Sequence, residues 1–201
     1  MAAAGFVLLV VAFAATTVSA CAFCAGLFAS RRKASAALPA QAARMFLVGR
    51  AGVAVTAAAL LVCCFILVFA FMTGDVSILY VLQERSHSTG SLAWLYKLSG
   101  LWAGRAGSLL FWAFLISVFN VAVLVRTARA SERLDNAALM VVQVVLAAFI
   151  GVLVFSEANM PFASTPARYF AAGGELSSSA ALLGMNTLLE HWAITIHPPT
   201  L

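Results

Sequence analysis

Charged side chains are scarce in this sequence, since only 9% of its 201 residues are Asp, Glu, Lys or Arg. A soluble domain usually carries about 25%, so the composition excludes an ordinary soluble globule. The hydrophobic content of 64% also excludes an intrinsically disordered chain. Glycine follows no three-residue period, which excludes collagen. The remaining class is an integral membrane protein.

Four long runs contain no charged residue. Each is near or above the ~20 apolar residues that a helix needs to cross about 30 Å of hydrocarbon. A strand or loop would leave backbone amides unpaired in lipid, so helices are expected. The sequence therefore predicts an all-α integral membrane protein with a single membrane domain, 1–201. Its four transmembrane helices are expected at about 5–29, 51–73, 107–125 and 137–155, with an external loop at 74–106 and an external tail at 156–201.

The few charges also predict which way the chain crosses the membrane. Eight basic residues lie in the connections after the first and third predicted helices: Arg31, Arg32, Lys33, Arg44, Arg50, Arg126, Arg129 and Arg133. The opposite side holds four basic residues and most of the acidic ones. Because cytoplasmic loops are enriched in Lys and Arg, the N-terminus, the loop and the tail are expected outside. Topology thus explains the net charge of +5, and no nucleic-acid partner is expected.

The four cysteines include one short motif, which could be a redox pair, half a zinc site or the start of a haem attachment site. Cys21 and Cys24 make a C-x-x-C pair followed by Ala25, whereas covalent haem attachment uses C-x-x-C-H. A structural zinc site needs four ligands, and Cys63 and Cys64 lie in another predicted helix with no histidine nearby. We expect these thiols to pack as small buried hydrophobic groups.

The predicted external loop is too apolar for a solvated linker. Tyr80, Trp94, Tyr96 and Trp102 are interleaved there with leucine and valine. One interpretation is an interfacial helix whose aromatic rings lie at the level of the lipid headgroups. The other is a surface that holds a flat apolar ligand between aromatic faces. Composition alone leaves both interpretations open.

The three histidines all fall on the predicted outer face, and one of them has an unusual context. His197 precedes Pro198 and Pro199, which favour an extended backbone before them and fit the first turn of a following helix. The imidazole would be fixed at the outer boundary with one ring nitrogen free to bind a metal. Leu176–Leu189 has no charge but is too short to span the membrane, so it predicts an interfacial or re-entrant helix. Because the chain ends at Leu201, we expect a natural split or a fragment, truncated at the start of a fifth span.

Two ordered motifs stand out, one running from the predicted external loop into the third predicted helix and one in the predicted external tail. The first reads LWAGRAGSLLFW at 101–112, and the second reads MNTLLE at 185–190 followed by IHPPTL at 196–201. They resemble the N-terminal part of the CcmF family, the haem lyases of cytochrome c maturation, whose typical blocks read LW-x-G-x-EGSLLLW and LNPLLQ…IHPPLL. The resemblance covers nearly the whole chain but only part of a typical family member.

The resemblance implies haem handling at the outer face of the cytoplasmic (inner) membrane and attachment of haem to apocytochrome c. In the family, the histidine of the HPP motif is proposed as an axial ligand to the haem iron, which makes His197 the expected metal ligand. Trp102 and Trp192 are then expected to wall the haem. Three cations are candidates to face its propionates: Lys97, Arg105 and Arg168. The family's further histidines and tryptophan-rich domain lie beyond the matched part, so activity would need a C-terminal partner chain or other maturation subunits.

The chain departs from the family pattern at Ala106, where Glu is usual, at Arg105, where a neutral residue is more frequent, and at Thr187, where Pro is usual. The role of the acidic side chain is therefore not carried over. Two alternative functions stay open: a non-catalytic membrane assembly or scaffold subunit, and a small transporter component. The lack of charge within the predicted spans counts against an ion pathway.

Overall fold

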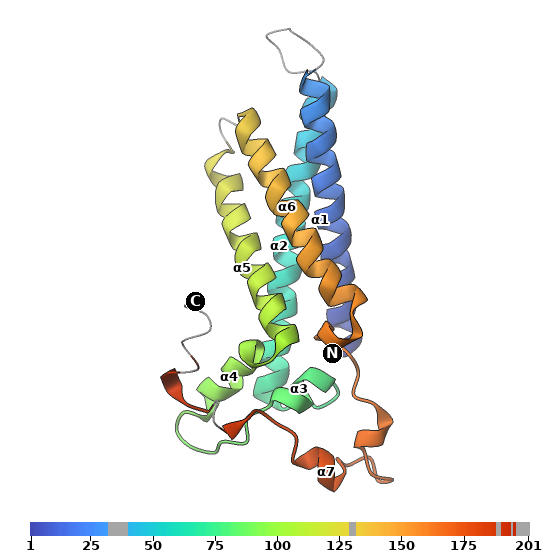
Figure 1. Ribbon diagram of the computed structural model, residues 1–201, viewed down its shortest axis with the longest axis vertical. Coiled ribbons are helices and arrows are strands. Elements are labelled where there is room, and N and C mark those ends of the chain that lie inside the picture. Colours follow the sequence, from blue (N-terminus) through green and yellow to red (C-terminus); the bar gives the residue numbers. More distant parts are fainter. Residues whose placement is uncertain (32–39, 129–131, 188–189, 194, 196–201) are drawn as a thin grey trace. The chain divides into compact units, whose positions relative to one another are not determined.

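The computed structural model describes residues 1–31, 40–128, 132–187, 190–193 and 195. Within this part of the chain the regular secondary structure is helical apart from two isolated β-bridges, and turns and irregular segments connect the helices. The elements are α1 (Ala2–Arg31), α2 (Ala40–Thr73), α3 (Leu79–Glu84), α4 (Ala93–Ala103), α5 (Arg105–Arg126), α6 (Arg133–Phe155), the 3-10 turns η1 (Glu157–Asn159) and η2 (Ala167–Tyr169), and α7 (Ser178–Ala181) (Figure 1).

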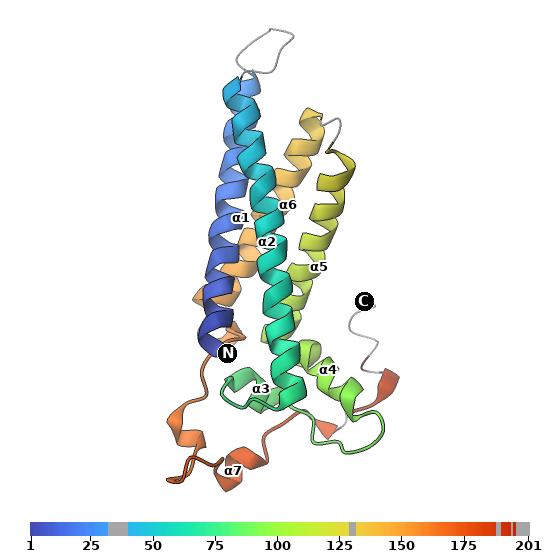
Figure 2. The same cartoon turned by 180° about the vertical axis from the view of Figure 1, so that it is seen from behind.

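Four of these helices, α1, α2, α5 and α6, are long and apolar enough to cross a membrane. Their most apolar windows have a mean hydropathy of 2.3 to 2.9. The expected all-α class with four membrane-crossing helices is therefore confirmed. The short helices α3 and α4 lie in the connection between α2 and α5, and α7 lies in the segment after α6 (Figure 2).

The chain divides into two compact units. We call Leu8–Leu61 with Trp112–Val152 the bundle unit. We call Met1–Val7 with Val62–Phe111 and Leu153–Leu201 the loop-bearing unit. Each of the four long helices contributes residues to both units, whereas α3, α4 and α7 belong to the loop-bearing unit alone.

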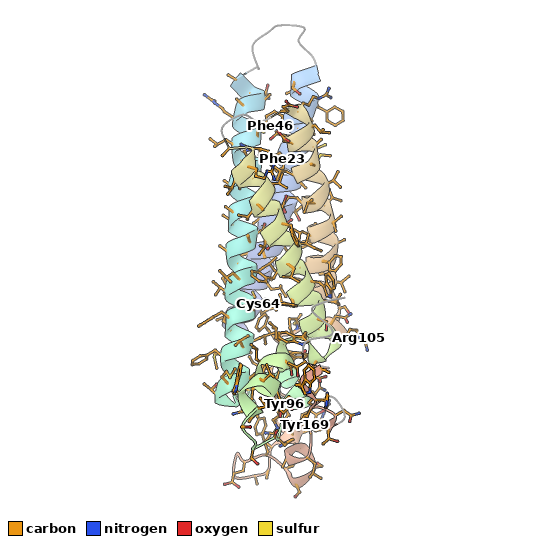
Figure 3. The ribbon with its side chains drawn as sticks, turned by 90° about the vertical axis from the view of Figure 1, so that its left-hand side faces the viewer. Phe23, Phe46, Cys64, Tyr96, Arg105 and Tyr169 are labelled. Carbon is orange, nitrogen blue, oxygen red and sulfur yellow. The ribbon has the colours of Figure 1, made fainter. Side chains whose placement is uncertain are left out.

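In the bundle unit, α1 and α2 approach closely because glycines leave room for aromatic rings. Phe46 lies over Gly26, where an added Cβ would come within 3.0 Å of the ring. Phe23 lies over Gly49 in the same way from the opposite helix, and the two ring centroids are 6.5 Å apart (Figure 3). These rings form one buried cluster with Ala42, Val53 and Leu139.

Polar side chains are also buried within the bundle unit: Thr16, Ser19, Thr56, Ser117, Asn120, Asn136 and Gln143. The hydroxyl of Thr16 donates to the side-chain and main-chain oxygens of Gln143 in α6, and that of Ser19 donates to the Gly49 carbonyl at 2.6 Å. Asn120 is only 1% exposed, and neither polar atom of its amide has a partner among the described residues. An unpaired amide in apolar surroundings is costly, so Asn120 weakens the packing of this unit.

α2 begins at Ala40, well before the charge-free run that starts at Ala51, and it carries two arginines in its first turns. The guanidinium of Arg50 donates to the Thr127 carbonyl at 3.2 and 3.3 Å and to the Thr127 hydroxyl at 2.6 Å. Thr127 follows the last residue of α5. The Arg50 guanidinium therefore lies at the C-terminal end of that helix, where carbonyls lack helical partners and the helix dipole is negative. A charged residue in α2 thus caps a neighbouring helix.

In the loop-bearing unit, the segment after α6 returns to the connection that leads into α3. The Leu79 amide donates to the Ala163 carbonyl at 2.8 Å, and the Thr165 amide donates to the Ser77 carbonyl at 2.9 Å. Together with the bridge between Ile78 and Ser164, these bonds make a short antiparallel pairing. Two segments that are far apart in the sequence are therefore held side by side.

The helix expected at Leu176–Leu189 is much shorter than predicted. Among the described residues 176–187, only Ser178–Ala181 is α-helical, with the Ser177 hydroxyl accepting from the Ala180 amide at its start. The carbonyls of Ala181 and Leu183 accept hydrogen bonds from side chains of another segment rather than from following amides. Side chains distant in the sequence thus end the helix, which its own composition does not predict.

The cysteines differ in their environment. Cys63 and Cys64 are buried and Cys24 is partly buried, whereas Cys21 is exposed. The expectation that all of them pack as buried groups is therefore wrong for Cys21. Cys21 lies at an exposed position of α1, so sequence composition alone overestimated its burial.

Candidate functional site

A buried tyrosine, Tyr80 of α3, organises the region that carries the first motif. Its hydroxyl donates to the Gly100 carbonyl at 2.9 Å and accepts from the Gly104 amide at 3.0 Å. Its ring meets Phe71 of α2 edge-on, with the centroids 5.8 Å apart. Burial raises the pKa of Tyr80 above its ordinary value, so the hydroxyl stays protonated and keeps its donor.

The motif's glycines permit this arrangement. Gly104 has extended backbone angles and separates α4 from α5, so the two helices meet at a bend. A Cβ on Gly107 would lie within 3.0 Å of both the Leu101 carbonyl oxygen and the Tyr80 hydroxyl. Only glycine lets the backbone of α5 approach so closely. The first motif therefore forms the joint between α4 and α5, with Tyr80 inside it.

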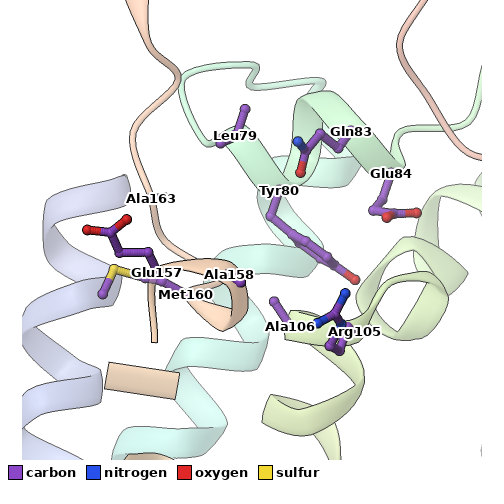
Figure 4. Close-up of a pocket in the computed structure, with 10 residues that line it drawn as sticks. All are labelled: Leu79, Tyr80, Gln83, Glu84, Arg105, Ala106, Glu157, Ala158, Met160 and Ala163. Atoms are coloured by element: carbon purple, nitrogen blue, oxygen red, sulfur yellow. The ribbon is translucent and has the colours of Figure 1, made fainter. Parts of the chain in front are cut away.

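A pocket of about 300 Å³ opens beside this joint (Figure 4). Its lining comes from α3, the first turn of α5 and the segment around η1: Leu79, Tyr80, Gln83, Glu84, Arg105, Ala106, Glu157, Ala158, Met160 and Ala163. Glu84 and Arg105 lie toward one wall and Glu157 toward the other. Desolvation raises the pKa of the half-buried Glu84. The pocket thus offers one guanidinium and two carboxyl groups to a small polar group.

The described residues include two of the three predicted for the haem site. Trp102, which is half-buried on α4, packs against Phe111 with the ring planes tilted by 36° and the centroids 5.4 Å apart. Its indole N–H donates to the Thr195 carbonyl at 3.1 Å. Trp192 is 57% exposed and its ring lies 5.8 Å from that of His191. The bond from Trp102 joins the helix of the first motif to the segment between the two parts of the second motif.

His197 lies outside the described residues. In the part of the chain that the structure describes, no ring contact links Trp192 to Trp102. No group of three or more His, Cys, Asp and Glu side chains among those residues has the geometry of a metal site.

Sequence reasoning missed a second attachment of the same segment. Arg85, Ser86 and His87 follow α3, and their side chains bond to residues between 180 and 190. We call Arg85–His87 the clasp. Its partners are mostly backbone carbonyls almost a hundred positions away. Nothing in the local sequence indicates such a contact, because backbone carbonyls are present at every residue.

Comparison with known proteins finds several relatives. Over 137 residues the chain is 31% identical to the probable cytochrome c-type biogenesis protein NrfE of Escherichia coli K12, which covers 68% of this chain and 22% of that protein. It is 30% identical over 135 residues to the cytochrome c-type biogenesis protein CcmF of Pseudomonas fluorescens, with 67% and 18% covered. It is 32% identical over 136 residues to CycK of Rhizobium meliloti 1021, with 68% and 18% covered. The chain is thus similar to several CcmF-family proteins over about two thirds of its own length.

The resemblance drawn from the two motifs is thereby confirmed. The chain spans between 18% and 22% of the length of these CcmF-family relatives. No family model matches the chain. No solved structure matches it either.

Within the CcmF pattern, the departures at 105 and 106 fall on the pocket. Ala106 is buried and contributes only a methyl group where the family motif usually carries Glu. Arg105 lies beside it on an exposed position of the first turn of α5. A small residue at 106 therefore leaves pocket volume that a glutamate side chain would fill.

The cations expected near haem propionates lie in different settings. Arg105 lines the pocket. Arg168 places its guanidinium 5.2 Å from the centre of the neighbouring Tyr169 ring, and Lys97 is half-buried on α4. Their role toward propionates stays a prediction.

Proposed function

We propose that this chain acts in cytochrome c maturation, handling haem at the outer face of the cytoplasmic membrane for attachment to apocytochrome c. Its relatives are named as cytochrome c-type biogenesis proteins, and its four long apolar helices suit a multi-pass membrane protein. In this proposal the N-terminus, the loop 74–106 and the tail 156–201 are external. The observation that carries it is the bond from Trp102 in the first motif to Thr195, which lies between the two parts of the second motif.

Haem is the substrate in this proposal, and His197 supplies an axial ligand to its iron. Trp102 suits a role in the wall of the site because its N–H is already bonded, which leaves ring surface for a flat ligand. Trp192 suits the same role because most of its ring surface is exposed. In this proposal the chain supplies one iron ligand, and the other ligands come from a C-terminal partner chain or another maturation subunit.

The chemistry of such a site is the addition of cysteine thiols to the haem vinyl groups. Each thioether forms when the sulfur bonds to one vinyl carbon and the thiol proton is delivered to the other, so no atom is lost. Haem and apocytochrome supply the reacting groups, and the protein supplies orientation and an iron ligand. In our proposal the residues of this chain hold haem while a partner chain completes the lyase.

A non-catalytic assembly subunit is the second candidate function. It is favoured by two exposed aromatic side chains, Trp94 at 58% and Trp192 at 57%, which suit contacts with a protein partner. In this alternative, the loop-bearing unit docks other maturation subunits and haem never binds.

The experiment that tests the proposal is haem binding by the whole chain. The chain would be produced in cells with active haem synthesis, purified in detergent and examined by absorption spectroscopy. We expect a haem spectrum in the wild type that is lost or shifted in His197→Ala and kept in His191→Ala, a matched exposed histidine. Equal haem content in all three proteins would exclude the ligand role of His197. A haem-free wild type that copurifies with maturation subunits would favour the assembly function.

A further inference from the structure

We propose that Arg85 and His87 are positioning residues that fix the segment 180–195 for haem binding, an inference that rests on the proposed function. The two residues lie just after α3 in the loop-bearing unit. Neither belongs to the two motifs that carry the family resemblance. Their contacts reach the segment that precedes the histidine proposed as iron ligand.

Arg85 makes the larger part of the clasp. Its Nε donates to the Leu183 carbonyl at 3.2 Å, and one terminal nitrogen donates to the carbonyls of Ala181 at 2.9 Å and Ala180 at 3.4 Å. Its own carbonyl accepts from the Met185 amide at 2.9 Å. A guanidinium has five N–H donors in a fixed planar fork, so it can bond several carbonyls in one geometry. Lysine cannot reproduce this pattern.

His87 bonds the same stretch from a second direction. Its Nε2 lies 2.9 Å from the Leu183 carbonyl oxygen, which can only accept, so the imidazole donates through Nε2–H. Gly184 lies against the same ring, where an added Cβ would come within 3.0 Å of Nε2. Nε2 is therefore committed to the backbone, which gives His87 a structural contact in place of a role as a metal ligand through that nitrogen.

The segment is attached at further points beyond the clasp's bonds to 180–185. The Ser86 hydroxyl donates to the Glu190 carboxylate at 2.5 Å, and the Trp102 indole donates to the Thr195 carbonyl at 3.1 Å. His197 follows Thr195 by two positions in the sequence. The bond from Ser86 to Glu190 is specific to one side chain, and the carbonyl bonds hold the nearby backbone, so together they fix the described residues of this segment in place. Small errors in placing a reacting group are costly to catalysis.

The first measurement needs no haem. Hydrogen exchange of the peptide containing Met185 would be followed in the full detergent-purified chain as wild type, Arg85→Ala, Arg85→Lys, His87→Ala and His87→Gln. We expect about tenfold faster exchange in Arg85→Ala and Arg85→Lys and a smaller increase in His87→Ala. His87→Gln should stay near wild type, since its amide N–H can donate to Leu183. Arg44→Ala is the matched control, because Arg44 is an exposed arginine of α2 in the bundle unit.

The second measurement is the haem absorption spectrum of the same proteins. We expect a shifted spectrum or reduced haem content in Arg85→Lys and His87→Ala and near-normal spectra in His87→Gln and Arg44→Ala. Unchanged exchange at Met185 in the Arg85 and His87 variants would overturn the clasp itself. Faster exchange with a wild-type haem spectrum would overturn the positioning role and leave the proposed function standing.

A wild type without haem would overturn both the proposed function and the positioning role, and the exchange data would then report a structural contact alone. If Arg85→Ala fails to fold, the pair His87→Ala and His87→Gln still decides the inference. The inference fails for His87 if these two variants give the same spectrum.

Discussion

The bundle unit and the loop-bearing unit use different interactions to hold their parts together. In the bundle unit, aromatic rings pack over glycines, as Phe46 does over Gly26, and hydroxyls such as that of Thr16 bond between helices. In the loop-bearing unit, side chains such as Tyr80 and Arg85 bond the backbone of distant segments. Apolar packing accepts many similar side chains, whereas each side-chain bond to a carbonyl needs one donor at one place. We therefore expect substitutions to affect the two units unequally.

The largest effect is expected from Gly107→Ala, which tests the close approach in the joint between α4 and α5. The added Cβ would lie within 3.0 Å of the Leu101 carbonyl oxygen, a backbone atom that cannot move aside easily. Overpacking of this kind costs about 1–3 kcal/mol, and contact with backbone favours the upper end. The measurement is the thermal midpoint of the detergent-purified chain.

Gly173→Ala is the matched control for this substitution. Gly173 has nothing within 4 Å of an added Cβ and is not among the glycines with positive φ. Its midpoint should equal or slightly exceed that of the wild type, because alanine lowers the entropy of the unfolded chain. Equal thermal midpoints for Gly107→Ala and Gly173→Ala would show that the joint between α4 and α5 accommodates an added methyl group, as apolar packing in the bundle unit is expected to do.

The next effect is expected from Tyr80→Phe, which removes one hydroxyl and keeps the ring contact with Phe71. The Gly104 amide and the Gly100 carbonyl would lose their partner in a buried place. Leaving such a group unsatisfied costs about 1–3 kcal/mol. Tyr96→Phe, at a half-buried position on α4, should leave the thermal midpoint unchanged. A similar loss in both variants would contradict the role of the Tyr80 hydroxyl.

The membrane helices could be predicted from the sequence because their signal is local. A run without charge is enough to indicate a helix that crosses lipid, and all four long apolar helices are present. The start of α2 could not be predicted in this way, since Arg50 is retained in the helix to bond Thr127. The stabilising contact of Arg50 depends on Thr127 at the end of another helix, 77 positions further along the sequence.

The candidate site was only partly predictable for the same reason. Trp102 was identified from its motif, whereas its bond to Thr195, a residue between the two parts of the second motif, had no sequence signal. Arg85 gave no such signal, because its acceptors are carbonyls that carry no sequence information. The short length of α7 was not predictable for the same reason. Composition favours a longer helix, but the clasp donates to carbonyls that the next helical turn would use.

Asn120→Leu tests the comparison in the bundle unit, where we expect the substitution to raise the free energy of unfolding. The Asn120 amide is buried with both polar atoms unpaired in the described part of the chain. Replacing it with an apolar group should gain up to about 1 kcal/mol, since the desolvation cost of the amide disappears. The measurement is unfolding in a denaturing detergent titration. A loss of more than that amount would instead indicate that a bound water or another group pairs with the amide.

Thr16→Val should give a smaller loss in the same titration. The substitution keeps the shape of the side chain and removes the hydroxyl that donates to Gln143. Hydrogen bonds between membrane helices contribute about 0.6 kcal/mol on average. Thr17→Val is the control, because the Thr17 hydroxyl bonds Phe13 within its own helix. A larger loss for Thr17→Val would contradict the role of the contact between α1 and α6.

The smallest effect is expected from Glu84→Gln, and it depends on pH. Desolvation raises the pKa of Glu84 from its ordinary 4.5, so the folded state holds this proton more tightly than the unfolded chain does. The free energy of unfolding should therefore fall as pH rises from 4.5 through the raised pKa. Glu84→Gln removes this slope and is slightly more stable at neutral pH, by a small amount because solvent reaches the half-buried carboxyl.

Thermal midpoints of the wild type and Glu84→Gln from acidic to neutral pH measure this slope, with Glu157→Gln on the opposite wall of the pocket as the control. The control should keep the wild-type slope, since Glu157 is exposed. A wild-type midpoint that rises toward neutral pH, and does not rise in Glu84→Gln, would contradict the prediction. Arg105 would then stabilise the charged Glu84 carboxylate. An ion pair within one wall of the pocket would add to the backbone contacts that hold the loop-bearing unit together.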